Sequence, residues 1–276
     1  MASNKLTVSD FDFDNIKTNL KTFLQGQSEF QDYDFEGSGF AILLDTLAYN
    51  THYLGFNANM LANEMYLDSA DIRKNIVSLA KMLGYTPNSC RASNATLSVK
   101  INNVPNTVNS ITMDKGTVYT TSIDGQSYQF VTNQSYTVQP TAGVFQFDNV
   151  NVFEGTLVTF KYTVDTNDVD QKFIIPAANA DTSTLKVSVQ TSASDTTTEV
   201  YNIANSYSGL TSTSKSYFLQ EGDDNRFEVY FGDGQLGKKP VDGNIIILEY
   251  IVTNKTEGNG ASSFVLSGDI DGFSDV

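Results

Sequence analysis

The sequence has almost none of the residues that build disulfides, catalytic triads or His/Cys metal sites. It contains one cysteine, Cys90, and one histidine, His52, in 276 residues. A single cysteine excludes an intrachain disulfide and is consistent with folding in a reducing compartment. One histidine and one cysteine give little basis for a Ser–His–Asp triad or a zinc site. We therefore expect that the protein is not an enzyme and that it has no metal or other cofactor.

Positive charge and long apolar runs are also scarce. The chain has 17 Lys and Arg against 32 Asp and Glu, which gives a formal net charge of −15. Nucleic acids and anionic lipids are recognised through Lys and Arg, so this balance argues against both as partners. No run approaches the roughly 18 apolar residues of a membrane span. We expect no nucleic acid partner and no membrane insertion, and the acidic balance suits a basic protein partner.

The first 86 residues have the three- and four-residue apolar spacing of amphipathic helices. Asp12 or Asp14 is expected to cap a first helix that ends at Gly26, and Ser38 to cap a longer second helix. A third helix is expected from about Ser69 to Leu83. This segment is therefore predicted to be a bundle-forming helical domain.

The second helix and the segment before it are the candidates for a partner interface. The helix is apolar on more than one side, and such helices are usually buried on more than one side. The run from Glu29 to Glu36 alternates acidic and aromatic residues, which are either exposed for a partner or folded back onto their own helices. The interface candidates are Phe30, Tyr33, Phe35, Leu44, Leu47, Leu54 and Leu61, and the apolar face is widened by Tyr49, Tyr53, Phe56 and Tyr66.

Period-2 alternation replaces the helical spacing from Ala92 onward, and it predicts many short β-strands separated by turn residues. We expect an α+β fold in which a segment of about three helices is followed by a mainly antiparallel β region. The expected domains are 1–86, 87–165 and 166–276, the last two sandwich-like, with a single larger β domain or a partly open barrel as alternatives.

A glycine-rich stretch between two expected strands is the most distinctive local feature. It reads as strand, tight turn and strand, and we interpret it as a structural hairpin. A phosphate-binding loop is the alternative, but Lys239 stands where that motif needs Ser or Thr and no helix is expected to follow. A calcium loop is a second alternative, although the acidic spacing does not match an EF-hand. The hairpin residues are Phe231, Gly232, Asp233, Gly234, Gly237, Pro240 and Gly243.

This stretch and six other segments resemble a known family. The pattern F-G-D-G at 231–234, L-G-K-K-P at 236–240 and G-N-G at 258–260 resembles the baseplate J-like family, as does the Glu154-Gly155 pair. The N-terminal segments 44–50, 59–64, 71–75 and 80–85 more narrowly resemble the baseplate wedge proteins of T-even-like contractile-tailed phages.

The resemblance implies a structural subunit of the tail baseplate wedge without enzymatic activity. It implies that the helices join a bundle with other wedge proteins and a second copy of the chain, in a ring of six wedges around the hub. It implies a place in the virion after synthesis in the host cytoplasm, and a part in relaying the trigger for sheath contraction. Close members are longer, so we expect a fragment or a minimal form. A receptor- or glycan-binding β module is the alternative function.

Overall fold

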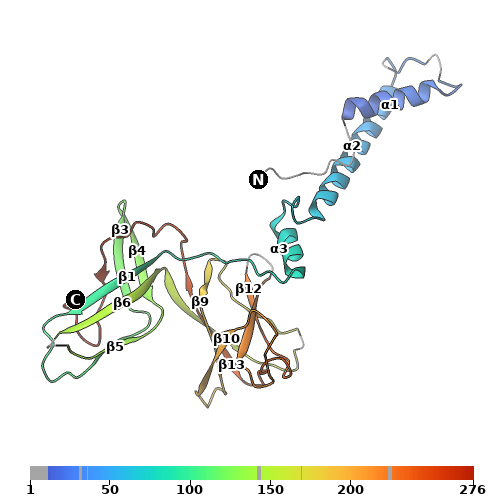
Figure 1. Ribbon diagram of the computed structural model, residues 1–276. Helices are drawn as coiled ribbons and strands as arrows, with labels where there is room; N and C mark the ends of the chain where they lie inside the picture. The colour runs from blue at the N-terminus through green and yellow to red at the C-terminus, as the bar shows by residue number, and fades with distance from the viewer. Residues whose placement is uncertain (1–11, 31–32, 36, 142–143, 169, 223–225) are drawn as a thin grey trace. The chain divides into compact units, whose positions relative to one another are not determined.

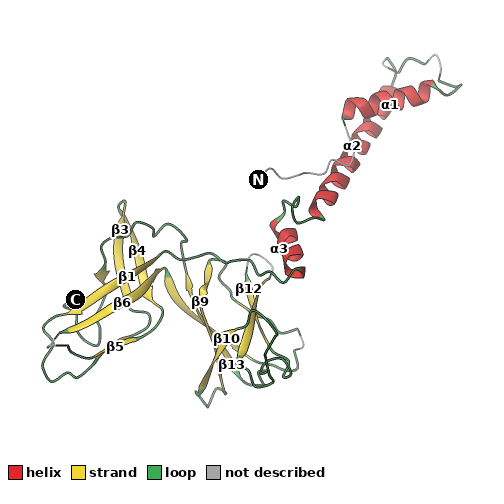
Figure 2. Cartoon of the chain, in the orientation of Figure 1, coloured by secondary structure: helices red, strands yellow, loops and turns green. Residues whose placement is uncertain are grey.

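The computed structural model describes residues 12–276 except 31–32, 36, 142–143, 169 and 223–225 (Figure 1). The chain divides into two compact units between Thr86 and Pro87. The described residues form three helices in the first unit and fourteen strands in the second (Figure 2). The predicted α+β class is confirmed.

The three helices are α1 (Phe13–Gln25), α2 (Phe40–Glu64) and α3 (Arg73–Met82). Asp12 is the N-cap of α1, and its carboxylate accepts the backbone N–H of Asp14 at 2.8 Å. The predicted cap of α2 is wrong, because the Ser38 hydroxyl makes no hydrogen bond and Gly39 occupies the N-cap position. Ser38 contributes its backbone carbonyl instead, which accepts the N–H of Ala41 at 3.0 Å.

Helix α3 begins later than the expected Ser69 because a carboxylate from α2 caps it. Glu64 accepts the backbone N–H groups of Asp71 at 3.0 Å and Ile72 at 3.2 Å, and the side-chain amide of Asn75 at 2.7 Å. The hydrogen bond from Asn75, and then that from Asp71, lower the pKa of Glu64. These N–H groups would otherwise lack an acceptor at the helix start. The turn between α2 and α3 is therefore held by a side chain outside α3.

The strands of the second unit are mostly short and pair in three sheets. All pairs are antiparallel except β10 with β11, which is parallel. The strands are β1 (Asn94–Ile101), β2 (Ile111–Met113), β3 (Val118–Ile123), β4 (Gln126–Thr132), β5 (Tyr136–Val138), β6 (Phe145–Glu154), β7 (Thr156–Thr163), β8 (Phe173–Ile174), β9 (Ala180–Gln190), β10 (Thr198–Ile203), β11 (Ser216–Glu221), β12 (Phe227–Phe231), β13 (Ile245–Val252) and β14 (Val265–Leu266).

The two large sheets curl rather than lie flat. The seven-stranded sheet has the order β7-β13-β9-β10-β11-β12-β8 and forms a nearly closed barrel. The Tyr162 hydroxyl on β7 donates to the Ile174 carbonyl on β8 at 2.7 Å and so joins its two edges. The five-stranded sheet, in the order β1-β6-β4-β3-β14, forms a half-barrel, and β2 pairs with β5. The partly open barrel, stated as an alternative to the expected sandwich-like domains, is the description that fits these two sheets.

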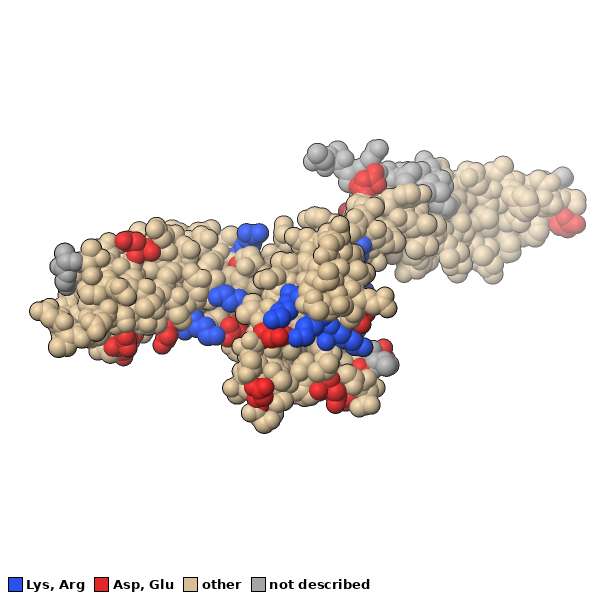
Figure 3. All heavy atoms as spheres, turned by 60° about the horizontal axis from the view of Figure 1, so that its bottom comes forward, with Lys and Arg blue, Asp and Glu red and all other residues tan. Residues whose placement is uncertain are grey.

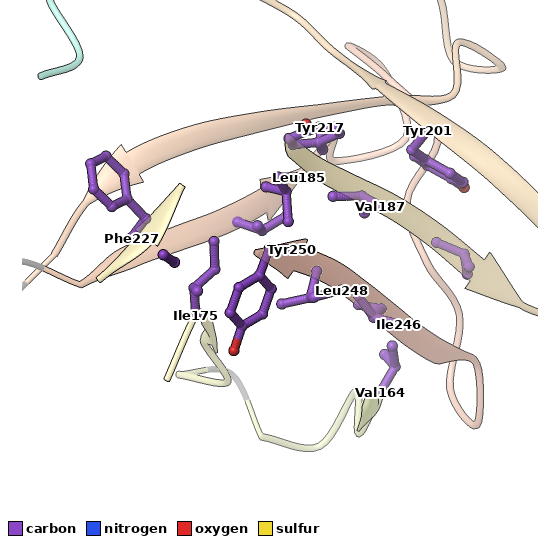
Figure 4. Packing of buried hydrophobic residues seen from close by; sticks show 13 residues of the cluster. Val164, Ile175, Leu185, Val187, Tyr201, Tyr217, Phe227, Ile246, Leu248 and Tyr250 are labelled. Carbon is purple, nitrogen blue, oxygen red and sulfur yellow. The ribbon is translucent and has the colours of Figure 1, made fainter. Parts of the chain in front are cut away.

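Each curled sheet has its own apolar core. Figure 4 shows Ile175, Leu248 and Tyr250 close together inside the barrel, and all three are almost completely buried. The half-barrel encloses a second cluster that includes Phe130, Phe147 and Ile270. Since successive strand residues point to opposite faces, the period-2 pattern of the sequence places the strand residues among them, such as Phe147 and Leu248, inside.

The last strand returns to the first sheet. Val265 and Leu266 of β14 pair with Thr120 and Tyr119 of β3, and Ile270 is 1% exposed in the half-barrel core. The barrel is thus built from one continuous stretch, 156–252, inserted between the parts of the half-barrel. The sheets change over at Gly155 and again after Val252, whereas the expected boundary lies at 165. The ranges 1–86, 87–165 and 166–276 remain predictions about domains.

The chain passes from the half-barrel to the barrel at Gly155, which has a φ of +119°. A Cβ atom there would lie 2.1 Å from the carbonyl oxygen of Val252. This close approach lets β7 pair with β13 at once, beginning with Thr156 opposite Val252. Only glycine fits the position, both in its backbone angle and in its space.

We expect Gly155→Ala to lower the free energy of unfolding by about 3 kcal/mol or more, because backbone strain and overpacking add. Gly125→Ala is the matched control, since Gly125 also has a positive φ, +82°, but open space around its Cβ position. The control should lose only about 1–2 kcal/mol. Urea unfolding followed by circular dichroism measures both, and equal losses would contradict the close-approach explanation.

Candidate functional site

Helix α2 exposes far more apolar surface than it buries. Only Leu44, Ala48 and Gly55 of its 25 residues are buried. At 100° per residue these three lie on one face of the helix. The rest of the circumference carries two further apolar stripes, each roughly a third of a turn away.

The first stripe, called here the leucine seam, consists of Leu47, Leu54 and Leu61. They are spaced by seven residues and are 47%, 60% and 65% exposed. Leucine repeated every seven residues is the pattern by which one helix packs along another. The leucine seam therefore has the form of a helix-packing surface without a neighbour among the described residues.

The second stripe, called here the aromatic seam, repeats with the same period. Ile42, Tyr49 and Phe56 are seven residues apart, as are Tyr53 and Met60, and all five are exposed. The rings of Tyr49 and Tyr53 stack with centroids 6.4 Å apart. The sequence predicts that Tyr49, Tyr53 and Phe56 widen the apolar face of this helix, but it does not predict a separate seam. Their seven-residue spacing is the signal that could have found it.

Charge is nearly absent from both seams. The only Asp, Glu, Lys or Arg residues in α2 are Asp45 and Glu64. Asp45 forms an ion pair with Lys17 of α1 at 2.5 Å, and Glu64 caps α3. On the face that Figure 3 shows, the helical unit at the right carries few charged side chains. A surface this apolar is typical of a permanent interface.

Two of the predicted interface residues are corrected by their burial. Leu44 is 1% and Phe35 3% exposed, so neither side chain is available to a partner. Phe35 lies in an aromatic cluster before α2, with ring centroids 5.1 Å from Tyr33 and 6.3 Å from Phe30. The ring of Phe40, the first residue of α2, lies 5.8 Å from Phe30 and 6.1 Å from Phe35, so these aromatic side chains fold back onto their own helix, one of the two alternatives left open. Tyr33 stays 40% exposed at the edge of the cluster.

The glycine-rich stretch is not a hairpin. β12 pairs with β11 and β8, whereas β13 pairs with β7 and β9. Residues 232–244, called here the glycine-rich connection, link two strands that are not neighbours. Phe231, before the connection, packs its ring against Phe173 and Tyr201 of the barrel. The predicted order of strand, turn and strand is confirmed, but the prediction that the two strands pair with each other is wrong.

A compact turn at 232–237 directs the chain away from β12. A Cβ atom on Gly232 would lie 2.3 Å from the Leu236 carbonyl oxygen, so no other residue fits. The N–H of Gly237 donates to the Thr211 carbonyl at 3.0 Å, and the N–H of Lys238 to the Ser214 carbonyl at 2.8 Å. These two hydrogen bonds fasten the turn to the loop before β11.

Hydrogen bonds to Asp233 and positive φ angles at two glycines shape the rest of the glycine-rich connection. Asp233 accepts the backbone N–H groups of Gln235 at 2.8 Å and Leu236 at 2.9 Å. These backbone hydrogen bonds, the one from Leu236 first, lower the pKa of Asp233. Gly234 and Gly243 have positive φ angles, and Pro240 is buried. Six of the seven motif residues thus lie along one connection, where they shape the backbone, and Phe231 precedes it at the end of β12.

The geometry does not fit a phosphate-binding loop. The N–H groups of Gly234, Gly237 and Lys238 all donate to backbone carbonyls, so they do not point at an anion. The Lys238 ammonium pairs with Glu199. Among the described residues, no cluster of three His, Cys, Asp or Glu could hold a metal ion. No described helix is long and apolar enough to cross a membrane.

Comparison with known proteins gives two matches. Residues 12–85 match the family model described as the helical domain of gp6-like baseplate wedge proteins. Over 270 residues the chain is 30% identical to the baseplate wedge protein gp6 of Enterobacteria phage T4, covering 91% of this chain and 40% of that protein. The chain therefore spans less than half the length of this relative. The broader baseplate J-like resemblance remains an interpretation.

We expect Gly232→Ala to speed amide hydrogen exchange at Gly237 and Lys238 by about tenfold or more, because the added methyl group displaces the turn from the 211–214 loop. Gly234→Ala is the control, since its positive φ of +93° adds backbone strain while the nearest atom to its Cβ position is 3.8 Å away, so the methyl group overlaps nothing. Exchange of these two amides, measured by NMR, should therefore speed up much less in the control than in Gly232→Ala. Equal acceleration in both variants would contradict the proposed packing.

The cap at Asp233 also predicts a pH dependence. Folding lowers the pKa of Asp233. The contribution of this carboxylate to the free energy of unfolding is therefore complete above the pKa of the unfolded state, about 3.9, and is lost as the pH falls through the pKa of the folded state. A carboxyl titration by NMR should give a midpoint below about 3.9. The variant Asp233→Asn identifies the NMR signal of this carboxyl group and removes the pH-dependent part of the stability that the group contributes. A midpoint at or above the ordinary value would contradict the cap.

Proposed function

We propose that this protein is a structural subunit of the baseplate wedge of a contractile phage tail, and that α2 joins it to partner helices. The matches to the gp6-like helical domain and to a phage T4 baseplate wedge protein support a structural, non-enzymatic role. The observation that carries the proposal is the pair of exposed heptad seams on α2. The family match covers all three helices and so includes both seams.

The energetics of α2 require a neighbour. Burying one exposed leucine side chain contributes about 1.5–3 kcal/mol, and each seam offers several large apolar side chains. A seven-residue repeat matches another helix better than a sheet, because it keeps one stripe in contact along a supercoil. The occupants of the seams are therefore helices with apolar heptad stripes of their own.

Two seams call for two neighbouring helices. The buried face of α2 includes Leu44 and Ala48, and α1 packs against α2 within the chain. The leucine seam offers branched aliphatic side chains, and the aromatic seam offers broad, flat rings. We propose that they receive different helices, one from a second copy of this chain and one from another wedge protein.

The remaining steps of the proposal follow from the resemblance to wedge proteins. The subunit is made in the host cytoplasm and enters the virion at the tail baseplate. It assembles with other wedge proteins and its second copy into a ring of six wedges around the hub. In that position the β unit passes the trigger for sheath contraction from one neighbour to the next.

The leucine seam can be tested by substitution. We expect Leu47→Asp with Leu54→Asp to weaken co-assembly with wedge partners by at least about 100-fold, because two carboxylates would have to be buried unpaired. Val241→Asp with Val265→Asp is the control, since both valines are more than 60% exposed in the β unit. Co-purification from cells that express the baseplate proteins measures assembly, and circular dichroism checks the fold.

The aromatic seam needs its own variant. Tyr53→Asp with Met60→Asp should release one partner while the leucine seam keeps the other, so the two double variants should lose different proteins. Assembly that survives both double variants in folded protein would contradict the helical interface. Binding to cell-surface glycan in place of tail proteins would favour the receptor-binding alternative.

A further inference from the structure

Two segments of the β unit that are far apart in the sequence meet at Glu154. The half-barrel ends its strand β6 there, the barrel begins at the next strand, and the chain returns from the barrel at Thr253. Glu154 is 1% and Thr253 2% exposed. Two sequence motifs about 100 residues apart, Glu154-Gly155 and the G-N-G run at 258–260, therefore lie at one junction.

The Glu154 carboxylate binds the returning segment through three hydrogen bonds. One oxygen accepts the Thr253 hydroxyl at 2.6 Å and the backbone N–H of Asn254 at 2.9 Å. The other accepts the side-chain amide of Asn254 at 2.8 Å. The stem of the same side chain packs on Gly258, where a Cβ atom would lie 2.7 Å from the Glu154 Cγ. A buried carboxylate held by three donors is a strong and directional contact.

The segment that enters the β unit is tied to the same place. The backbone N–H of Glu154 donates to the Ser93 carbonyl at 2.8 Å, and the Ser93 hydroxyl donates to the Lys255 carbonyl at 2.9 Å. The junction thus joins the entry to the half-barrel, the step into the barrel and the return from it.

A second contact spans the two curled sheets at another point. Lys115, which follows β2, forms an ion pair with Glu249 of β13 at 2.5 Å. The Lys186 ammonium on β9 donates to the Asn133 carbonyl beyond β4. The Lys115–Glu249 pair is partly exposed, so its own contribution is small, but it opposes rotation about the junction.

We propose that Glu154 is a clasp that fixes the half-barrel and the barrel as one rigid body. The chain crosses between the half-barrel and the barrel at only two places, at Gly155 and after Val252. Two such crossings by themselves could act as a hinge. The clasp binds one crossing to the other, and the contact between Lys115 and Glu249 holds a second point. A rigid β unit transmits a displacement applied to one curled sheet directly to the other.

The test measures the distance between the two sheets in the full chain. Spin labels at Ser127→Cys on the half-barrel and Thr196→Cys beside the barrel, in a Cys90→Ser background, report the spread of distances by pulsed electron paramagnetic resonance. Both label sites are exposed. The parent protein should show one narrow distribution of label-to-label distances. Glu154→Ala should widen this distribution by about twofold or more, since the half-barrel and the barrel would then move relative to each other as rigid bodies with large amplitude.

Two further variants separate the clasp from general destabilisation. Glu154→Gln should stay narrow, because its oxygen can accept from Thr253 and Asn254 while the Asn254 amide turns to face its NH₂ group. Asp148→Ala should also stay narrow, since Asp148 is an exposed carboxylate on the same strand that bonds only to side chains of the half-barrel.

The outcomes decide the proposal. A narrow distribution in folded Glu154→Ala, or a broad one in the parent, would overturn it, and a Gln variant as broad as the Ala variant would overturn the hydrogen-bond account. If Glu154→Ala does not fold, Thr253→Val removes one donor at nearly constant volume. Widening in that variant supports the clasp, and an unchanged distribution overturns it.

Discussion

The β unit depends on the close crossing of its own backbone at Gly155 and Val252. Because no side chain stands between them, β7 pairs with β13 from its first residue, and this pairing places the edge of the barrel. The same crossing brings Glu154 against Thr253 and Asn254, which closes the junction with a buried carboxylate. The return of the chain to the half-barrel, and the burial of Ile270 there, follow from that path.

The helical unit has the opposite character. Its polar contacts satisfy the helix ends, as Asp12 and Glu64 show, but its longest helix leaves most of its large apolar side chains exposed. Such a surface suits a permanent complex, in which other helices cover the seams. In an isolated protein the same surface would favour aggregation. The two units thus divide the work of a structural subunit between a helix that joins partners and a β unit with its own cores.

The glycine-rich connection shows where local patterns stop being informative. Strand, glycine turn and strand are the local signals of a hairpin, and the two strands formed as expected. Their pairing was wrong because the N–H groups of Gly237 and Lys238 fasten the turn to the 211–214 loop, which lies more than 20 residues earlier in the chain. Likewise, Leu44 and Leu47 both belong to the apolar pattern of α2, but Leu44 is 1% exposed and Leu47 is 47% exposed.

The amino-acid sequence by itself determined the three helices, the switch to period-2 strands, an aspartate cap at Asp12 or Asp14 and the apolar spacing of α2, whereas the structure decided which aspartate caps and which leucines are exposed. These features depend on residues a few positions apart, since periodicity and capping are local. Only the tertiary structure decided which strands are neighbours, that the last strand returns to the first sheet, and that Glu154 meets Thr253. Such contacts join segments about 100 residues apart, and the choice among them rests on how all the strands pack at once.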